Sequence, residues 1–353
     1  MKKKQRKKLG FGIWVILFIN YIAIISLLLS YLGAFLNPSF ISFPQFFSII
    51  YPLLFFINLF FVLFWISLWR KYFLYSLFAL IIGISFFQRT FNFSKPERFY
   101  NDNFSIITYN VHLFNYYKWQ GREFTHRKIF SLIKSKNPDL LFMQEFLDNK
   151  KVKSFKLFST LFPYNTVSYN SNTVKAGLVI FSKFPIISSG KIKYKDQAFA
   201  IYSDIKIGQD TLRFINVHLR SIYLTKTDYN SLDSLKFKDS RLKKIVDKLT
   251  KGYIERSKEV KILTNLIDTT HYPIVLCGDF NDTPLSYTYT QISKRLVDAF
   301  SIAGFGLGST YKQLLPILRI DYIFVSDDLQ ILDYNKIKVN FSDHYPLWAE
   351  IGK

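Results

Sequence analysis

The chain has 353 residues, 49% of them hydrophobic and 19% aromatic, and carries 47 basic against 25 acidic side chains, a net charge of +22. This much apolar surface excludes an intrinsically disordered protein. The single cysteine, Cys277, excludes an intrachain disulfide, and we interpret it as a small apolar residue at the end of a buried strand.

Long uncharged runs dominate the first 88 residues, which form the predicted membrane region. The runs cover residues 11–32, 46–69 and 72–88. The first two exceed the roughly 20 residues that cross the hydrocarbon core of a bilayer, whereas the third is barely long enough. Three such runs so close together predict three transmembrane helices rather than buried helices of a soluble protein.

Basic residues lie before the first run and between the second and third runs, but not between the first and second runs. Residues 2–8 read KKKQRKK, Arg70 and Lys71 separate the second run from the third, and the loop 34–45 carries no charge. Because positive residues favour the cytoplasmic side, this pattern predicts a multi-pass protein of the cytoplasmic membrane with the rest of the chain outside the cytoplasm. If the third run does not cross, the rest of the chain lies in the cytoplasm instead.

Residues 89–102 are polar and predict a linker to one soluble domain, residues 103–353. Short β-rich runs alternate there with few helical patterns, which predicts sheets packed face to face with helices outside, an α+β sandwich. The lysine-rich stretch 226–261 indicates solvated helices. The expected strands are 104–109, 139–143, 177–181, 199–207, 211–217, 273–277, 320–325 and 346–351, and the expected helices are about 123–136, 235–250 and 253–268.

Polar residues gather where these apolar runs end. A lone polar residue at a strand end is typical of a turn, but strand ends are also where a rigid scaffold presents catalytic groups. Several such places along one chain favour the second interpretation. The candidate site residues are Asn110, Glu145, His218, Asp279, Asn281, Asp321, Asp343 and His344.

The side chains of this set share a chemistry. Carboxylates and carboxamides without a thiol suit a hard cation such as Mg²⁺ or Mn²⁺, and histidines suit proton transfer or stabilisation of a charged oxygen. Together they are the parts needed for in-line attack of water on a phosphoester. The chain contains no GxxxxGK[ST] and no GxSxG, so it has neither a P-loop nor a nucleophile elbow that would indicate a different chemistry.

These residues lie in motifs that resemble, in order, those of the endonuclease/exonuclease/phosphatase superfamily, which includes deoxyribonucleases, AP endonucleases, sphingomyelinases and inositol-polyphosphate 5-phosphatases. The resemblance covers about residues 103–352. It implies a four-layered α/β/β/α sandwich of two mixed sheets, here preceded by transmembrane helices. The motifs are TYNVH (108–112), QE (144–145), NVHL (216–219), GDFND (278–282), RIDYIF (319–324) and SDH (342–344).

The resemblance also implies a metal site. Glu145 would bind the divalent ion, Mg²⁺ or alternatively Mn²⁺. Asn110 would lie beside it and hold metal or phosphate, and Asp343 would lie near the metal.

The remaining residues would then carry the reaction. Asp279 would orient or deprotonate the attacking water, and Asn281 would hydrogen-bond the phosphate. His344 would contact the oxygen on which negative charge grows, with Asp321 fixing its ring. His218 would stabilise or protonate the leaving oxygen.

The sequence leaves the substrate open between nucleic acid and a phospholipid headgroup. The chain beyond residue 97 keeps a net charge of +13, which attracts either polyanion, and the predicted anchor places the site near a lipid bilayer. No obligate protein partner is evident. The alternative hypothesis is an inactive membrane protein whose domain binds phosphorylated ligands.

Other polar residues suggest structural roles. We interpret His112, His126 and His271 as surface or strand-edge histidines. Asp282 and Thr283, which precede a proline, predict the N-cap of a helix.

Overall fold

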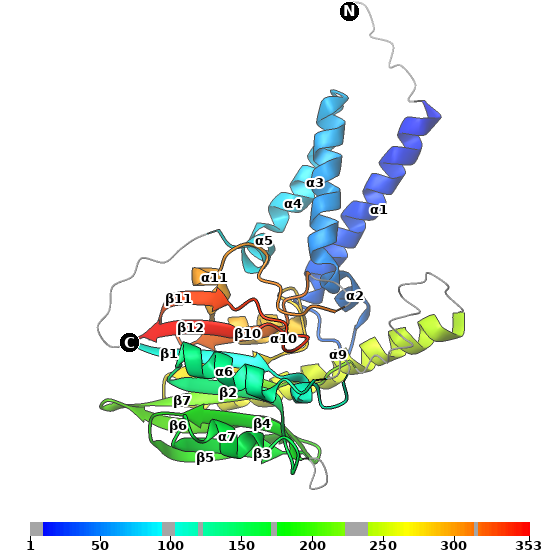
Figure 1. The fold of residues 1–353 in the computed structure, drawn as a ribbon. Coiled ribbons are helices and arrows are strands. Elements are labelled where there is room, and N and C mark those ends of the chain that lie inside the picture. The colour runs from blue at the N-terminus through cyan, green and yellow to red at the C-terminus, as the bar shows by residue number, and fades with distance from the viewer. Residues whose placement is uncertain (1–9, 94–102, 119–122, 171–174, 223–238, 314–316) are drawn as a thin grey trace, which may run out of the picture.

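The computed structural model describes residues 10–93, 103–118, 123–170, 175–222, 239–313 and 317–353. Within these ranges the chain forms a bundle of apolar helices and, beyond it, a two-sheet sandwich with helices outside (Figure 1).

The sandwich contains two six-stranded mixed sheets. The first has the strand order β11-β12-β1-β2-β4-β3, with β1 and β2 parallel. The second has the order β5-β6-β7-β8-β10-β9, with β7 and β8 parallel. The strands are β1 (Asn103–Asn110), β2 (Leu140–Asp148), β3 (Tyr164–Tyr169), β4 (Lys175–Ser182), β5 (Ile186–Tyr194), β6 (Gln197–Ile207), β7 (Asp210–His218), β8 (Ile274–Asp279), β9 (Val297–Asp298), β10 (Asp321–Val325), β11 (Gln330–Lys336) and β12 (Leu347–Gly352).

Three apolar cores hold the layers together. Because side chains alternate along a strand, Ile106 of β1 packs between the two sheets, whereas Ile107 packs against the outer helices of the first sheet. The central core also contains Cys277, which is fully buried. The first sheet is covered by α6 (His126–Lys136) and α7 (Ser154–Phe158), the second by α9 (Asp239–Asp268) and α10 (Tyr287–Ser293), and α11 (Ala299–Ala303) packs at β10 and β11. The predicted four-layered sandwich is confirmed.

All eight predicted strands are present. The structure adds β3, β5, β9 and β11, and each of these lies at an edge of a sheet. The prediction of two separate helices over 235–250 and 253–268 is wrong, because one 30-residue helix, α9, covers the described part of that stretch. Residues 235–238 lie outside the described ranges.

The described part of the predicted membrane region contains five helices: α1 (Phe11–Gly33), α2 (Phe43–Ile49), α3 (Tyr51–Ser67), α4 (Phe73–Ile82) and α5 (Ile84–Thr90). Among the described residues, α1 alone is long and apolar enough to span a bilayer as one helix. The other two predicted spans are not continuous helices, because α2 and α3 meet at 74° and α4 and α5 at 64°.

Both breaks have a local cause. Pro52 lies in the first turn of α3, where its fixed φ suits a new helix start, so the run 46–69 divides at Ile50. At Gly83, between α4 and α5, the backbone approaches the Tyr31 ring so closely that a Cβ atom would collide with it.

Buried polar side chains connect the apolar helices. Asn20 of α1 donates to Ser76 Oγ of α4 at 2.7 Å and accepts from Trp65 Nε1 of α3 at 2.8 Å. Asn58 of α3 donates to the Ala23 carbonyl oxygen at 3.1 Å. An apolar environment offers these groups no other partners, so the bonds fix how the three helices pack.

The helices join the sandwich at one end. In Figure 1, α1, α3 and α4 project from the sandwich, with the start of α1 and the α3–α4 turn at the far end and α2 and α5 at the near end. From the near end, Arg89 donates to Thr290 Oγ1 at 3.2 Å, and Asn92 pairs with Gly306. Residues 94–102 of the predicted linker lie outside the described ranges.

Candidate active site

Three strand ends of the second sheet bring the central residues together. The parallel register of β7 and β8 pairs His218 with Asp279, and the antiparallel register of β8 and β10 pairs Asp279 with Asp321. Three side chains that lie far apart in the sequence therefore lie together at one end of these three strands.

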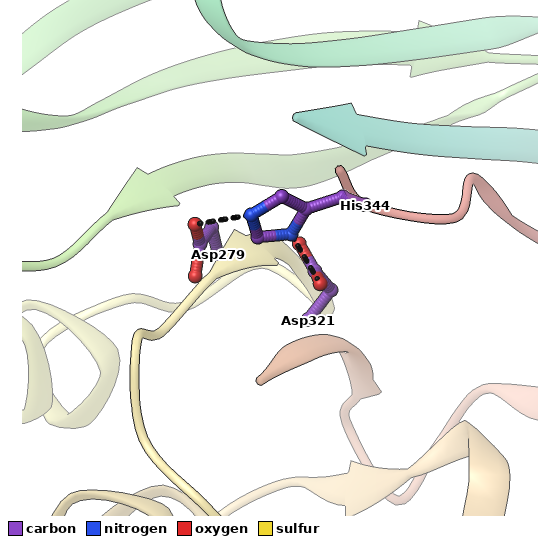
Figure 2. A group of neighbouring side chains, drawn as sticks. All are labelled: Asp279, Asp321 and His344. Carbon is purple, nitrogen blue, oxygen red and sulfur yellow. Dashed lines mark hydrogen bonds and ion pairs between the residues drawn. The ribbon is translucent and has the colours of Figure 1, made fainter. Parts of the chain in front are cut away.

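His344 lies between two carboxylates (Figure 2). Its Nδ1 is 2.8 Å from Asp321 Oδ2, and its Nε2 is 3.7 Å from Asp279 Oδ2. Burial by itself lowers the pKa of His344, but the charges of Asp321 and Asp279 outweigh it and raise the pKa to about 10. The ring is therefore an imidazolium at neutral pH.

Asp279, Asp321 and His344 also satisfy the spacing of a metal site, with one candidate ligand atom of each within 4.8 Å of the others. A histidine must be neutral to ligate a metal, whereas this ring is held protonated. The arrangement therefore favours a hydrogen-bonded acid–histidine pair over a three-ligand metal site.

Asp279 is completely enclosed. It accepts from Asn110 Nδ2 at 2.9 Å and from the Asn281 backbone N–H at 2.8 Å. Burial and the neighbouring Asp321 carboxylate raise its pKa against the opposing charges of His344 and His218. A carboxylate with a raised pKa is a stronger base.

Glu145 is directed into the site by a bulge. The register between β2 and β4 shifts between Met143 and Phe146, and Glu145 has a φ of 52°. Bulges re-aim side chains next to active sites, and a positive φ at a non-glycine residue costs energy. The Glu145 carboxylate is half-buried and lies 3.3 Å from Asn110 Nδ2.

His218 faces the same carboxylates from β7. Its Nε2 is 3.7 Å from Glu145 Oε1 and 3.8 Å from Asp279 Oδ2, and among the described residues this buried nitrogen has no hydrogen-bond partner. Asn281, at a φ of 52°, donates one side-chain N–H to the Leu219 carbonyl oxygen at 3.0 Å.

Asp343 lies at the rim of this group. Its Oδ1 is 3.2 Å from His112 Nδ1, and Ser342 of the same motif donates to the Asn110 carbonyl oxygen at 2.7 Å. The interpretation of His112 as a surface or strand-edge histidine is wrong, since its side chain is only 15% exposed and pairs with a candidate site residue.

A left-handed backbone turn positions His112. Residues 112–115 all have φ between 47° and 55°, and the His112 N–H donates to Asn110 Oδ1 at 3.0 Å. L-residues adopt this conformation at a cost, and no sequence pattern announces it here. Of the two other histidines with a structural interpretation, His271 is exposed and His126 is partly buried.

Supporting residues behind the site went unassigned at the sequence level. Asn216, fully buried on β7, donates to the backbone oxygens of Met143 and Val179, both at 2.9 Å, and accepts from Gln144 Nε2 at 2.6 Å. It therefore ties the second sheet to β2 and β4 of the first. Thr310 Oγ1 accepts the backbone N–H of Asp321 at 3.1 Å. Asn216 lies in the motif NVHL and Gln144 in the motif QE. Their place in these motifs is the sequence feature that could have identified them as supporting residues.

The predicted N-cap at Asp282 and Thr283 is wrong. The helix α10 begins at Tyr287, and Ser286 caps it by accepting the Tyr289 N–H. Asp282 instead pairs with the buried Arg256 of α9, whose Nε is 3.1 Å from Asp282 Oδ2.

Residues 107–344, more than half of the chain, match the Endonuclease/Exonuclease/phosphatase family. The chain belongs to this family.

Solved structures agree with the family fold. The catalytic domain of human Nocturnin with bound sulfate is 17% identical, with 72% of this chain and 95% of that chain covered at a TM-score of 0.53. A conserved protein of unknown function from Enterococcus faecalis V583 is 21% identical, covering 70% and 99% at 0.53. The mannosyl-6-phosphatase of Bacteroides thetaiotaomicron VPI-5482 is 16% identical, covering 71% and 100% at 0.50.

As a member of the endonuclease/exonuclease/phosphatase family, the chain has the fold of hydrolases that act on phosphoesters. Its residues 13–90 match a second family, Domain of unknown function (DUF8431). No curated protein sequence matches the chain.

Proposed function

We propose that this protein is a membrane-anchored, divalent-metal-dependent phosphoesterase that hydrolyses phosphodiester or phosphomonoester bonds by in-line attack of water. One observation carries the proposal. Asp279, Asp321, His344 and His218 lie together at one end of the strands β7, β8 and β10, and Glu145 faces them. An inactive binding domain has no need for a buried carboxylate pair around a protonated histidine.

The donor set fits a hard cation. His218 Nε2 is buried and lies 3.7 Å from Glu145 Oε1 and 3.8 Å from Asp279 Oδ2. Both distances exceed hydrogen-bond range, so this nitrogen has no partner among the described residues. Glu145 would hold Mg²⁺ or Mn²⁺ with Asn110, and Asp343 would support the site from the rim. A bound divalent ion polarises the phosphoryl oxygen and neutralises charge there.

The chain's own residues carry the proton and charge work. Asp279, with its raised pKa, orients the attacking water and accepts its proton. The His344 imidazolium, held by Asp321, donates to the phosphoryl oxygen on which negative charge grows. Asn281 keeps one side-chain N–H for the phosphate, because an amide has two and the other is bound to Leu219.

His218 is assigned to the leaving oxygen. It emerges from the strand beside Asp279, so it can reach the phosphoryl group from another side than His344. Its nitrogen has room to protonate or stabilise the departing alkoxide.

The membrane region, residues 1–88, supports a topology of three crossings with the catalytic domain, residues 103–353, outside the cytoplasm. By length and composition, α1 gives one span, and the bent pairs α2–α3 and α4–α5 would give two more if each pair crosses as a broken span. Arg70 and Lys71 lie in the α3–α4 turn, at the end of the bundle away from the sandwich (Figure 1). The positive-inside rule then favours the cytoplasmic side for that end of the bundle. The protein would accordingly be a multi-pass protein of the inner membrane.

For the substrate we propose a phosphoester of nucleic acid or of a phospholipid headgroup. The anchor favours the lipid, and the positive charge attracts both. The similarity to a phosphatase of Bacteroides thetaiotaomicron keeps phosphomonoesters within the proposal.

The test is a substrate panel with the purified full chain in detergent and Mg²⁺. The panel contains plasmid DNA, RNA, sphingomyelin, phosphoinositides and bis-nitrophenyl phosphate, with Asp279→Asn as the control for contaminating enzymes. We expect turnover that EDTA abolishes and Mg²⁺ or Mn²⁺ restores. Full activity in EDTA, or equal activity of Asp279→Asn, contradicts the proposal, and binding without turnover favours the inactive alternative.

The topology has its own experiment. A C-terminal alkaline phosphatase fusion should be active in cells, and a C-terminal green fluorescent protein exported by the general secretory route should be dark. The opposite pattern places the domain in the cytoplasm and shows that residues 72–88 do not cross.

A further inference from the structure

Two active-site segments end at a single buried arginine. Arg256 of α9 is fully buried, and its Nε donates to Asp282 Oδ2 at 3.1 Å while its Nη1 donates to the Arg220 carbonyl oxygen at 2.9 Å. Asp282 lies three residues after Asp279, and Arg220 lies two residues after His218. One guanidinium thus joins the chain beyond the base to the chain beyond the leaving-group histidine.

The two segments are also bonded to each other. The Leu219 N–H donates to the Asp279 carbonyl oxygen at 2.9 Å, and Asn281 Nδ2 donates to the Leu219 carbonyl oxygen at 3.0 Å. On the α9 side, Glu259 accepts the Arg220 N–H at 2.7 Å. A shift of α9 is therefore passed to both segments together.

Neighbouring residues of the same helical turns, Tyr253 and Ser257, contact the predicted membrane region. The contacts come from the α1–α3 connection, residues 34–50, which includes α2. Ser257 Oγ is 2.8 Å from Ser39 Oγ, and the Tyr253 ring packs edge-on to Phe46 with centroids 5.7 Å apart. Tyr253 in turn lies 5.0 Å from the Arg256 guanidinium.

The connection is itself anchored to the first span. Gln45 Nε2 donates to the Gly33 carbonyl oxygen at the end of α1 at 2.6 Å, and Ser48 Oγ donates to the Ser30 carbonyl oxygen at 2.9 Å. A continuous path of packed and hydrogen-bonded groups therefore runs from α1 through α9 to the site.

We propose that Arg256 is a positioning residue of the active site, and that the α1–α3 connection holds it in place through Tyr253 and Ser257. The membrane region then acts as part of the catalytic scaffold and sets the spacing between His218 and Asp279. This inference rests on the proposed phosphoesterase function for its kinetic test.

The kinetic test uses the full chain in detergent micelles with bis-nitrophenyl phosphate, a soluble ester that needs no membrane. Arg256→Gln should lower kcat by about 10- to 100-fold with KM nearly unchanged, because displacement of a catalytic group by about 1 Å costs on the order of 10²-fold. Arg256→Lys should recover part of the loss, since it keeps the charge opposite Asp282.

The matched control is Arg213→Gln. Arg213 makes a comparable pair with Asp204, at 2.7 Å and 2.8 Å, but at the start of β7, five residues before the site. It should lower the melting temperature and leave kcat unchanged. If Arg256→Gln loses only stability, as Arg213→Gln should, the positioning role is overturned.

A second variant tests the membrane contribution without touching the arginine. Phe46→Ala removes the ring that packs on Tyr253 and should lower kcat several-fold, whereas Phe40→Ala, 87% exposed in the same connection, should not. Equal kcat for Phe46→Ala and the wild type overturns the membrane part of the inference.

Amide hydrogen exchange gives a readout that does not need activity. Both Arg256→Gln and Phe46→Ala should speed exchange in peptides covering 218–222 and 279–285 and leave the β3–β4 hairpin unchanged. Unchanged exchange at both peptides overturns the inference. An inactive wild type that still shows these exchange effects refutes the phosphoesterase function and retains the mechanical connection.

Discussion

Replacing Asp321 by Asn removes the charge that holds His344 protonated. The carboxylate lies 2.8 Å from His344 Nδ1 inside the protein, where charges interact strongly. The pKa of His344 is about 10, against an ordinary value near 6.5, a difference worth on the order of 5 kcal/mol in favour of the imidazolium. Asparagine keeps the shape but supplies none of that charge.

In Asp321→Asn the pKa of His344 should fall, because the lowering effect of burial is then opposed by Asp279, at 3.7 Å, and by the weaker influence of Asp343, without the adjacent carboxylate. Since the protonated ring is the active form in the proposed mechanism, wild-type activity should persist on the alkaline side up to about pH 10, and the variant should lose activity at a lower pH. At pH 8 we expect kcat/KM to fall by about 10²–10³, the cost of removing one charge-stabilising donor.

The assay is kcat/KM against pH on bis-nitrophenyl phosphate with Mg²⁺. Asp204→Asn is the control, because it breaks a buried acid–arginine pair away from the site and should leave the profile unmoved. The wild-type to variant ratio should be smallest at acid pH. A loss that is equal at every pH, or an alkaline limb at the same pH in both proteins, refutes the reasoning.

The same shift has a consequence for stability. A raised histidine pKa contributes stability that is complete below pH 6.5 and lost as the pH rises through about 10. The melting temperature of the metal-free wild type should therefore fall over this interval, and that of Asp321→Asn should fall less.

Three further predictions concern the rest of the site. Glu145→Gln should raise the Mg²⁺ concentration needed for half-maximal rate while leaving the melting temperature in EDTA unchanged, because a ligand charge is lost without a change of volume; an unchanged requirement removes Glu145 from the metal site. His218→Ala should be severe on an alkyl phosphodiester and milder on a nitrophenyl ester, whose leaving group needs no proton, and equal losses would favour phosphate binding instead. Asn216→Ala should lower the free energy of unfolding by about 3 kcal/mol, because the buried backbone oxygens of Met143 and Val179 lose their hydrogen bonds to this side chain. A loss below about 0.5 kcal/mol would show that the two sheets do not depend on this bridge.

The strands that sequence patterns found and missed divide by position. Each predicted strand is interior to its sheet, and the four missed ones, β3, β5, β9 and β11, are the edges. An interior strand is flanked on both sides and largely buried, so most of its residues are apolar and form a detectable run. An edge strand such as β5 is largely exposed and carries polar residues, which leaves no run to detect.

For the candidate site, the sequence determined the residue types and their order, because the candidate catalytic groups lie at the ends of apolar runs. It also determined the family, since the motifs survive as local strings. Only the tertiary structure brought His112 to Asp343, Asn216 across to β2 and Asp282 to Arg256. Those pairs are separated by 231, 73 and 26 residues, and a contact at such distance leaves no periodicity along the chain.

The predicted membrane region shows the same division. Hydropathy alone identified its three apolar runs, because a bilayer-crossing segment must lack charge throughout its length. Only the packed structure revealed that two of them bend, at Ile50 and Gly83, and that α2 reaches α9. These features depend on which helix lies beside which, and one-dimensional hydropathy carries no information about neighbours in space.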